Sequence, residues 1–223
     1  MSWIQKFKSS SIGRKQIVAI TGLLLCGFLI THLAGNLLLF AGFDPETGAC
    51  AFNDYAAKLT GNKPLLYIAE IILFSIFATH VYFAINLNME NSAARGPVPY
   101  HVDTDAGEIT FASKYMKYTG IFIMIFIVVH LANFKFAEQG PKGLYGVVED
   151  AFQSPLWSVF YIVSMFIISL HLRHGVKSVF QTLGLNHKKY NDIFDNISLG
   201  FAGIIFVGFS SFPVYFFLKG VAS

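Results

Sequence analysis

Five apolar runs are each long enough to cross a lipid bilayer, and they leave little of the chain for anything else. The runs cover about 16–42, 65–90, 114–137, 155–180 and 197–219. A helix rises ~1.5 Å per residue, so each run exceeds the ~20 residues needed to cross a hydrocarbon core of ~30 Å. The sequence therefore predicts an all-α membrane protein, with five transmembrane helices bundled in a single domain over residues 1–223.

The composition and the distribution of charge agree with this class. Hydrophobic residues make up 54% of the 223 and charged residues 13%, too little polar surface to cover a soluble domain. Eleven of the 16 Lys and Arg residues fall on the N-terminal side of the expected membrane. The positive-inside rule then places the N-terminus in the cytoplasm. The net charge of +3 is spread thinly, so nucleic acid is not an expected partner.

Four of the seven histidines lie inside the apolar runs, one in each of the first four. Ionisable residues within a membrane are rare and usually functional. In the predicted topology His32 and His130 lie toward the outside, and we call them the outer pair. His80 and His171 lie toward the cytoplasm, each 16 residues after the proline that opens its run, and we call them the inner pair.

Each pair brings two imidazoles from different helices to one depth, which is what the iron of a six-coordinate haem needs. The sequence thus predicts a bundle around two b-type haems, with iron ligands His32 and His130 for one and His80 and His171 for the other. Zinc or copper would favour three or four ligands at one level. A proton relay without haem would favour more carboxylates within the membrane than the single Glu70.

Cations at the inner level are candidates for holding haem propionates. Arg14, His174 and Lys177 lie at this level and are expected to contribute to cofactor binding. His174 follows His171 by three residues, on nearly the same face of a helix. Ordinary charge at the membrane interface is the alternative explanation for these residues.

The segments around the four histidines resemble one family of membrane cytochromes. They read FLITHLAGN, YIAEIILFSIFATHVYF, IVVHLANF and LHLRHGVKSVFQTLG, and AFNDYAAKL lies in the first outer connection. This pattern resembles the dihaem cytochrome b anchor of succinate dehydrogenases and fumarate reductases, in the type with one anchor of five helices. The resemblance extends over nearly the whole chain.

The resemblance implies a function in a respiratory complex. The chain would anchor an iron–sulfur subunit and a flavoprotein subunit at a bacterial cytoplasmic membrane, and exchange their electrons with a quinone, menaquinone being expected. It would not act on succinate by itself, and the whole complex could form a dimer. Glu70 has a counterpart in related anchors and is a candidate quinone or proton site. Some fumarate reductases carry a glutamate where this chain has Ser169.

Two other functions stay open at this point. One is the cytochrome b subunit of a different oxidoreductase, such as a formate dehydrogenase, hydrogenase or nitrate reductase. The other is a haem-free proton or solute transporter that uses the membrane histidines and Glu70. Bound haem separates the transporter from the cytochromes, and partner subunits separate the two cytochromes from each other.

Overall fold

The computed structural model describes residues 5, 7, 10–95, 111–185, 187 and 189–222, with the backbone alone at residues 95 and 111–114. These residues contain no strand. Lys6, Lys8 and Lys188, which contribute to the charge count above, lie outside them. Five helical stretches are long and apolar enough to cross a membrane, as the sequence predicts: Ser11–Ala41, Lys63–Ala94, Tyr115–Lys135, Pro155–Thr182 and Asn191–Ala222.

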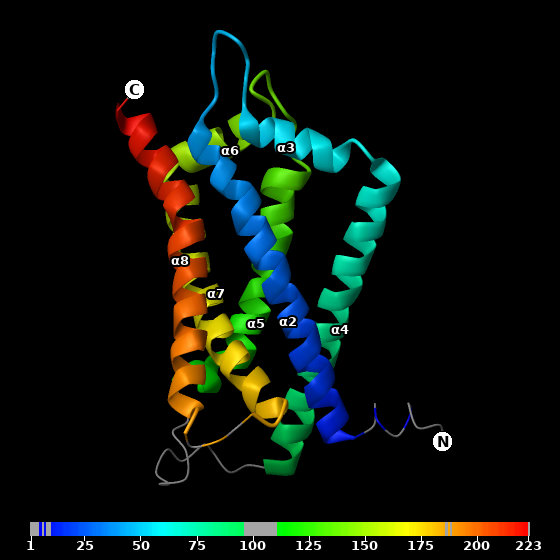
Figure 1. Cartoon of the computed structure of the whole chain (residues 1–223). Coiled ribbons are helices and arrows are strands. Elements are labelled where there is room, and N and C mark those ends of the chain that lie inside the picture. The colour runs from blue at the N-terminus through cyan, green and yellow to red at the C-terminus, as the bar shows by residue number, and fades with distance from the viewer. Residues whose placement is uncertain are drawn as a thin grey trace.

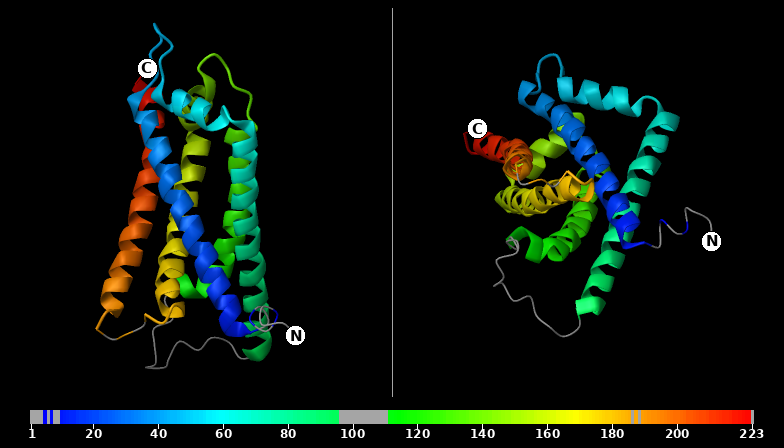
Figure 2. Two further views of the ribbon diagram at one scale, coloured as in Figure 1. Left: turned by 45° about the vertical axis from the view of Figure 1, so that its right-hand side comes forward. Right: turned by 60° about the horizontal axis from the view of Figure 1, so that its bottom comes forward.

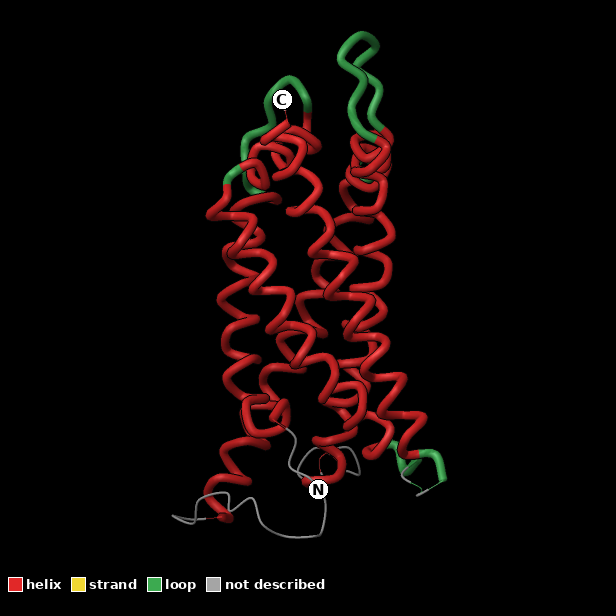
Figure 3. Tube along the Cα trace, turned by 90° about the vertical axis from the view of Figure 1, so that its left-hand side faces the viewer, coloured by secondary structure: helices red, strands yellow, loops and turns green. Residues whose placement is uncertain are grey.

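The long helices run side by side, with the N-terminus at one end and the C-terminus at the other (Figure 1). They are α2 (Ser11–Asn36), α4 (Lys63–Arg95), α5 (Phe111–His130), α7 (Pro155–Thr182) and α8 (Asn191–Ala222). A 3-10 turn, η1 (Leu37–Ala41), extends α2, and a π-helical turn, η2 (Leu131–Lys135), extends α5. The described connections lie at the two ends of the bundle (Figure 3).

Local chemistry explains where several helices begin. Ser10 caps α2, because its side-chain oxygen accepts a hydrogen bond from the backbone N–H of Gly13 at 3.0 Å. The Asn62 side chain accepts one from Leu65 N–H at 3.2 Å at the start of α4. Pro155 is the first residue of α7, a position where its missing N–H costs nothing. The helices extend beyond the apolar runs by up to about two turns, because capped polar ends can continue a helix outside the membrane.

Two short helices cross the end of the bundle that holds the C-terminus. They are α3 (Ala51–Thr60) and α6 (Gly143–Gln153), and Figure 1 shows both lying across the long helices. Asn53 joins them: its Nδ2 donates to the carbonyl of Lys142 at 2.9 Å, and its Oδ1 accepts from Tyr145 N–H at 2.9 Å. We call this the α3/α6 end. In the predicted topology it faces outward.

The long helices are unequally buried within the chain. α7 packs most extensively on α8, and also on α5 and α2, whereas α4 packs mainly on α2. In the most apolar part of α7 39% of residues are buried, and in that of α4 none is. Figure 2 shows α4 at the edge of the bundle. The interior therefore lies around α7, and α4 has faces left for lipid or for another group.

Candidate functional site

The outer pair comes together near the α3/α6 end. His32, four residues before the end of α2, and His130, the last residue of α5, have ring centroids 5.9 Å apart and planes at 89°. Two imidazoles that bind one metal ion from opposite sides have centroids about 6 Å apart, because each metal–nitrogen bond is ~2 Å. The separation of the rings therefore fits two axial ligands of a single iron.

Aromatic side chains enclose the outer pair. Phe28 stacks on His32 with centroids 5.3 Å apart, and Phe209 of α8 lies 5.6 Å from it. Around His130, Phe126, Phe134 and Tyr161 have their centroids at 5.6, 5.3 and 6.1 Å. Flat rings such as these suit the packing of a flat cofactor as well as of one another.

The polar atoms of the outer pair are poorly satisfied by the chain itself. His130 Nδ1 is buried and has no hydrogen-bond partner among the described residues. His32 Nδ1 makes a long contact of 3.4 Å with Asn36 Nδ2, which donates a shorter hydrogen bond to the His32 carbonyl at 2.7 Å. Buried polar atoms are normally paired, so the unpaired His130 Nδ1 indicates a partner that the described residues do not supply.

The inner pair is bonded to neighbouring helices. His80 of α4 has Nδ1 3.1 Å from Thr21 Oγ1 and 3.1 Å from the Val18 carbonyl oxygen, both on α2. His171 of α7 has Nδ1 3.1 Å from Thr119 Oγ1 on α5. Because Nδ1 is engaged in each, Nε2 is the nitrogen left to bind a metal.

The histidines of the outer pair and of the inner pair both fit haem as the bound group. In the part of the chain that the structure describes, no three His, Cys, Asp or Glu side chains converge to hold a bare metal ion. A haem iron takes only two ligands from the protein, because the porphyrin supplies the others. Two pairs of histidines are therefore a sufficient set of protein ligands for two haems.

The predicted propionate ligands lie at the other end of the bundle, and two of them are engaged in ion pairs. Arg14 of α2 pairs with Glu90 of α4. Lys177 donates to Asp195 of α8 at 2.8 Å. His174 is half-buried on α7, one turn from His171. A propionate at this level would share these cations with the two carboxylates.

Glu70 lies in the second turn of α4, near the α3/α6 end, and forms an ion pair with Lys135 of η2. The carboxylate and ammonium are 2.5 Å apart, and their side chains are 35% and 40% exposed. This pair bridges α4 and the extension of α5, two helices that otherwise scarcely touch. Ser169 of α7 is half-buried, and its hydroxyl donates to the Phe166 carbonyl at 2.7 Å.

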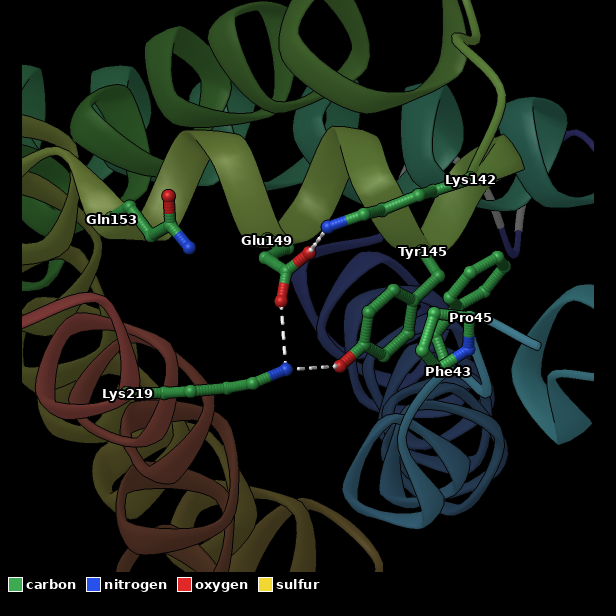
Figure 4. Close-up of a pocket in the computed structure, with 7 residues that line it drawn as sticks. All are labelled: Phe43, Pro45, Lys142, Tyr145, Glu149, Gln153 and Lys219. Atoms are coloured by element: carbon green, nitrogen blue, oxygen red, sulfur yellow. Dashed lines mark hydrogen bonds and ion pairs between the residues drawn. The ribbon is translucent and has the colours of Figure 1, made fainter. Parts of the chain in front are cut away.

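A pocket of about 310 Å³ opens at the α3/α6 end, and none of the four histidines lines it (Figure 4). Its centre is Glu149 of α6, whose side chain is 4% exposed. The carboxylate accepts from Lys142 at 2.6 Å and from Lys219 at 2.8 Å, and Lys219 also donates to the Tyr145 hydroxyl at 3.1 Å. The sequence analysis missed this network, because bonded partners such as Tyr145 and Lys219 are 74 residues apart and show no local pattern.

Burial and ion pairing act in opposite directions on the Glu149 carboxyl. Burial raises its pKa, but the hydrogen bonds and charges of Lys142 and Lys219 outweigh burial and lower the pKa below its usual value. Glu149 is therefore ionised at neutral pH. Its carboxylate joins α6 to the last turns of α8 through Lys219.

Comparison with known proteins gives one informative relative. No protein-family model matches the chain, and no solved structure matches it. The succinate dehydrogenase cytochrome b558 subunit of Bacillus subtilis (strain 168) is 27% identical over 177 residues, which is 77% of this chain and 79% of the relative. The chain is thus a multi-pass α-helical membrane protein similar to a succinate dehydrogenase cytochrome b subunit, which confirms the resemblance that the four histidine segments indicate.

Proposed function

We propose that this chain is the dihaem cytochrome b anchor of a succinate:quinone oxidoreductase, either a succinate dehydrogenase or a fumarate reductase. The observation that carries the proposal is the outer pair, in which α2 and α5 bring His32 and His130 to 5.9 Å. The similarity to a cytochrome b558 subunit of succinate dehydrogenase supports it.

The two pairs of histidines would hold two haem b groups, one above the other along the bundle. Bound haem supplies one-electron transfer, and histidines on both sides of an iron leave no position open for oxygen or substrate. Around the outer pair, Phe126, Phe134 and Tyr161 exclude water. At the inner level, Arg14, His174 and Lys177 provide positive charge for propionates.

The chain would work as one subunit of a larger complex in a bacterial cytoplasmic membrane, with its N-terminus inside. An iron–sulfur subunit would dock at the N-terminal end, near the inner pair, and carry a flavoprotein subunit where succinate and fumarate are interconverted. Electrons would then cross the bundle between that end and a membrane quinone, of which menaquinone is the expected type. The anchor would have no succinate chemistry of its own.

Glu70 is the residue that we propose for proton exchange with the quinone at the outer level. Its carboxylate is about one-third exposed and lies near the α3/α6 end. Its carboxylate is held in an ion pair by Lys135. For the carboxylate to take a proton, the ion pair has to open, so Lys135 would act as a positioning residue.

The test is haem quantitation with a reduced-minus-oxidised spectrum on the complex purified with its partner subunits. We expect two low-spin b haems per anchor chain. His32→Ala should remove or perturb one and His80→Ala the other, because the two histidines belong to different pairs. A purified complex without haem would overturn the proposal and favour a transporter. Two haems with partners that lack succinate activity would instead indicate another respiratory oxidoreductase.

A further inference from the structure

The two helices that carry the outer pair share a spaced motif that reaches the inner pair. In α2, Thr21-Gly22 precedes His32 by 11 residues, counted from the threonine, and in α5 Thr119-Gly120 precedes His130 by the same 11. Eleven residues correspond to three full helical turns plus about 20°, and they rise about 16 Å along the helix axis. Each helix therefore presents its threonine on the same face as its histidine, about 16 Å away along the helix axis.

Each Thr-Gly pair lies against an imidazole of the inner pair. Thr21 Oγ1 is 3.1 Å from His80 Nδ1, and Thr119 Oγ1 is 3.1 Å from His171 Nδ1. The following glycine lies beside the same ring. A Cβ at Gly22 would lie 3.2 Å from His80 Cε1, and one at Gly120 would lie 3.6 Å from His171 Cε1. Two helices thus make the same two contacts with two different histidines.

The hydroxyl protons fix the direction of these hydrogen bonds. Thr21 donates its proton to the Ile17 carbonyl at 2.7 Å, and Thr119 donates to the Met116 carbonyl at 2.9 Å. A hydroxyl whose only proton is used can offer Nδ1 only its oxygen, so Nδ1 carries a proton and donates it. For His80 the Val18 carbonyl, 3.1 Å from Nδ1, requires the same tautomer, because a carbonyl can only accept.

We infer that Thr21-Gly22 and Thr119-Gly120 are positioning pairs for the axial ligands of the inner haem. The threonine holds the Nδ1–H tautomer, which leaves Nε2 free for iron, and the glycine lets the imidazole approach the helix. A hydrogen bond from Nδ1–H to an acceptor also makes the imidazole a more basic ligand, which stabilises ferric iron. The inference rests on the proposed function, because it assumes that haem is bound.

The outer pair has no such support, which makes it an internal control. His130 Nδ1 has no partner among the described residues, and the contact of His32 Nδ1 is to an amide nitrogen. A change at either threonine should therefore act on the inner haem alone. Low-temperature electron paramagnetic resonance and a potentiometric titration, on the purified complex, resolve the two haems and follow each separately. His32→Ala and His80→Ala assign the signals.

The decisive variants are Thr21→Val and Thr119→Val, which keep the side-chain volume and remove the acceptor. We expect the midpoint potential of the inner haem to rise, and its resonance signal to shift, with both effects larger in the double variant. Thr→Ser variants should restore the original values, because serine keeps the hydroxyl. Ser75→Ala is the matched control, since the exposed Ser75 hydroxyl on α4 also bonds its own helix, at Ile71, without touching a histidine.

The glycines give a graded second test. Gly22→Ala should disturb the inner haem, because its Cβ would be 3.2 Å from the His80 ring, whereas Gly120→Ala should be tolerated at 3.6 Å. Selective loss of the inner haem from the valine variants or from Gly22→Ala supports the inference. An unchanged inner haem in the double valine variant, or an equal change in both haems, overturns it. Neither result would remove haem from the wild-type complex, so the proposed function is tested separately.

Discussion

The ring of His32 meets the ring of His130 edge-on, with the two centroids 5.9 Å apart. These residues are 98 positions apart in the sequence and lie on helices α2 and α5, each near the helix end. Among the residues that the structure describes, neither imidazole has a good hydrogen-bond partner at Nδ1. The contact therefore depends on packing by the surrounding aromatic side chains, and each ligand can be changed without breaking a hydrogen-bond network.

His130→Met is the first prediction. Methionine is an axial ligand of similar reach, and replacing one histidine by methionine raises the potential of a haem. We expect the outer haem to be retained with a midpoint potential higher by ~0.1 V or more, within the ~0.8 V range that axial ligands span. A potentiometric titration of the purified complex measures it. His187→Gln, at an exposed histidine outside both pairs, should leave both potentials unchanged. If the midpoint potential of the inner haem rose in place of that of the outer haem, the assignment of His130 to the outer pair would be wrong.

Glu70→Gln is the second prediction, and it tests the proton-exchange function. Glutamine keeps the shape of the side chain but cannot take up a proton at neutral pH. General acid–base groups contribute ~10²–10⁴-fold to rates, so we expect quinone-dependent turnover to fall at least about tenfold. Succinate oxidation with an artificial electron acceptor should continue, because that reaction bypasses the quinone.

Lys135→Met separates proton exchange from simple ion pairing. It breaks the same bridge to Glu70 but leaves the carboxylate in place. The activity of this variant should lie clearly above that of Glu70→Gln. Equal losses in the two variants would show that the bridge between α4 and η2 matters and that the carboxyl proton does not.

The third prediction concerns the pH dependence of stability at Glu149. Its pKa is lowered in the folded protein, since burial is outweighed by Lys142 and Lys219. The stabilisation is therefore present above the unfolded pKa of ~4.3 and is lost as pH falls through the lower folded value. We expect wild type to lose more thermal stability between neutral and strongly acidic pH than Glu149→Gln does, measured as the unfolding midpoint in detergent.

At neutral pH the same substitution should be destabilising. Glutamine leaves Lys219 and Lys142 without a charged partner, and we expect a loss of about 1–3 kcal/mol, since both lysines are half-exposed and water screens part of the effect. Glu138→Gln on the nearby loop is the control, because this exposed carboxylate should contribute little. Identical pH profiles for wild type and Glu149→Gln would refute the prediction.

The fourth prediction compares two glycines of α8. A Cβ at Gly208 would lie 2.7 Å from Leu33 Cδ2 of α2, whereas a Cβ at Gly203 meets nothing within 4 Å. Gly208→Ala should cost about 1–3 kcal/mol through overpacking at the α2–α8 contact. Gly203→Ala should be neutral by comparison. Thermal denaturation of the two purified variants compares their unfolding midpoints. Equal midpoints would mean that Leu33 moves aside at no cost.

The architecture could be predicted from the sequence because the bilayer imposes a simple rule on helix length. Five apolar runs became five long helices, and the helices α3 and α6 between them are too short to cross a membrane. Helix ends were placed less well, since caps such as Ser10 lie in polar sequence outside the apolar runs. The π-helical turn η2, directly after His130, carries no simple sequence signature.

The site could be predicted only in part, because its contacts link distant residues. Depth along each helix predicts the pairing of the four histidines, and the structure places His32 beside His130. The ion pair of Glu70 with Lys135 depends on how two helices meet, which no local pattern records. The Thr-Gly pairs had a signal that was missed: the same dipeptide, 11 residues before a histidine, occurs in both α2 and α5.

The lack of buried residues in the apolar part of α4 has a consequence for the order of assembly. α7 and α8 can form a stable scaffold through their own packing, with α5 and α2 alongside, whereas α4 gains little from direct contact with α5. A large planar ligand between α4 and the scaffold would supply the missing apolar surface. We therefore expect α4 to dock last, when bound haem fills the space between it and the other helices. A cell starved of haem would then accumulate anchor chains in which this helix is the first to be cleaved by proteases.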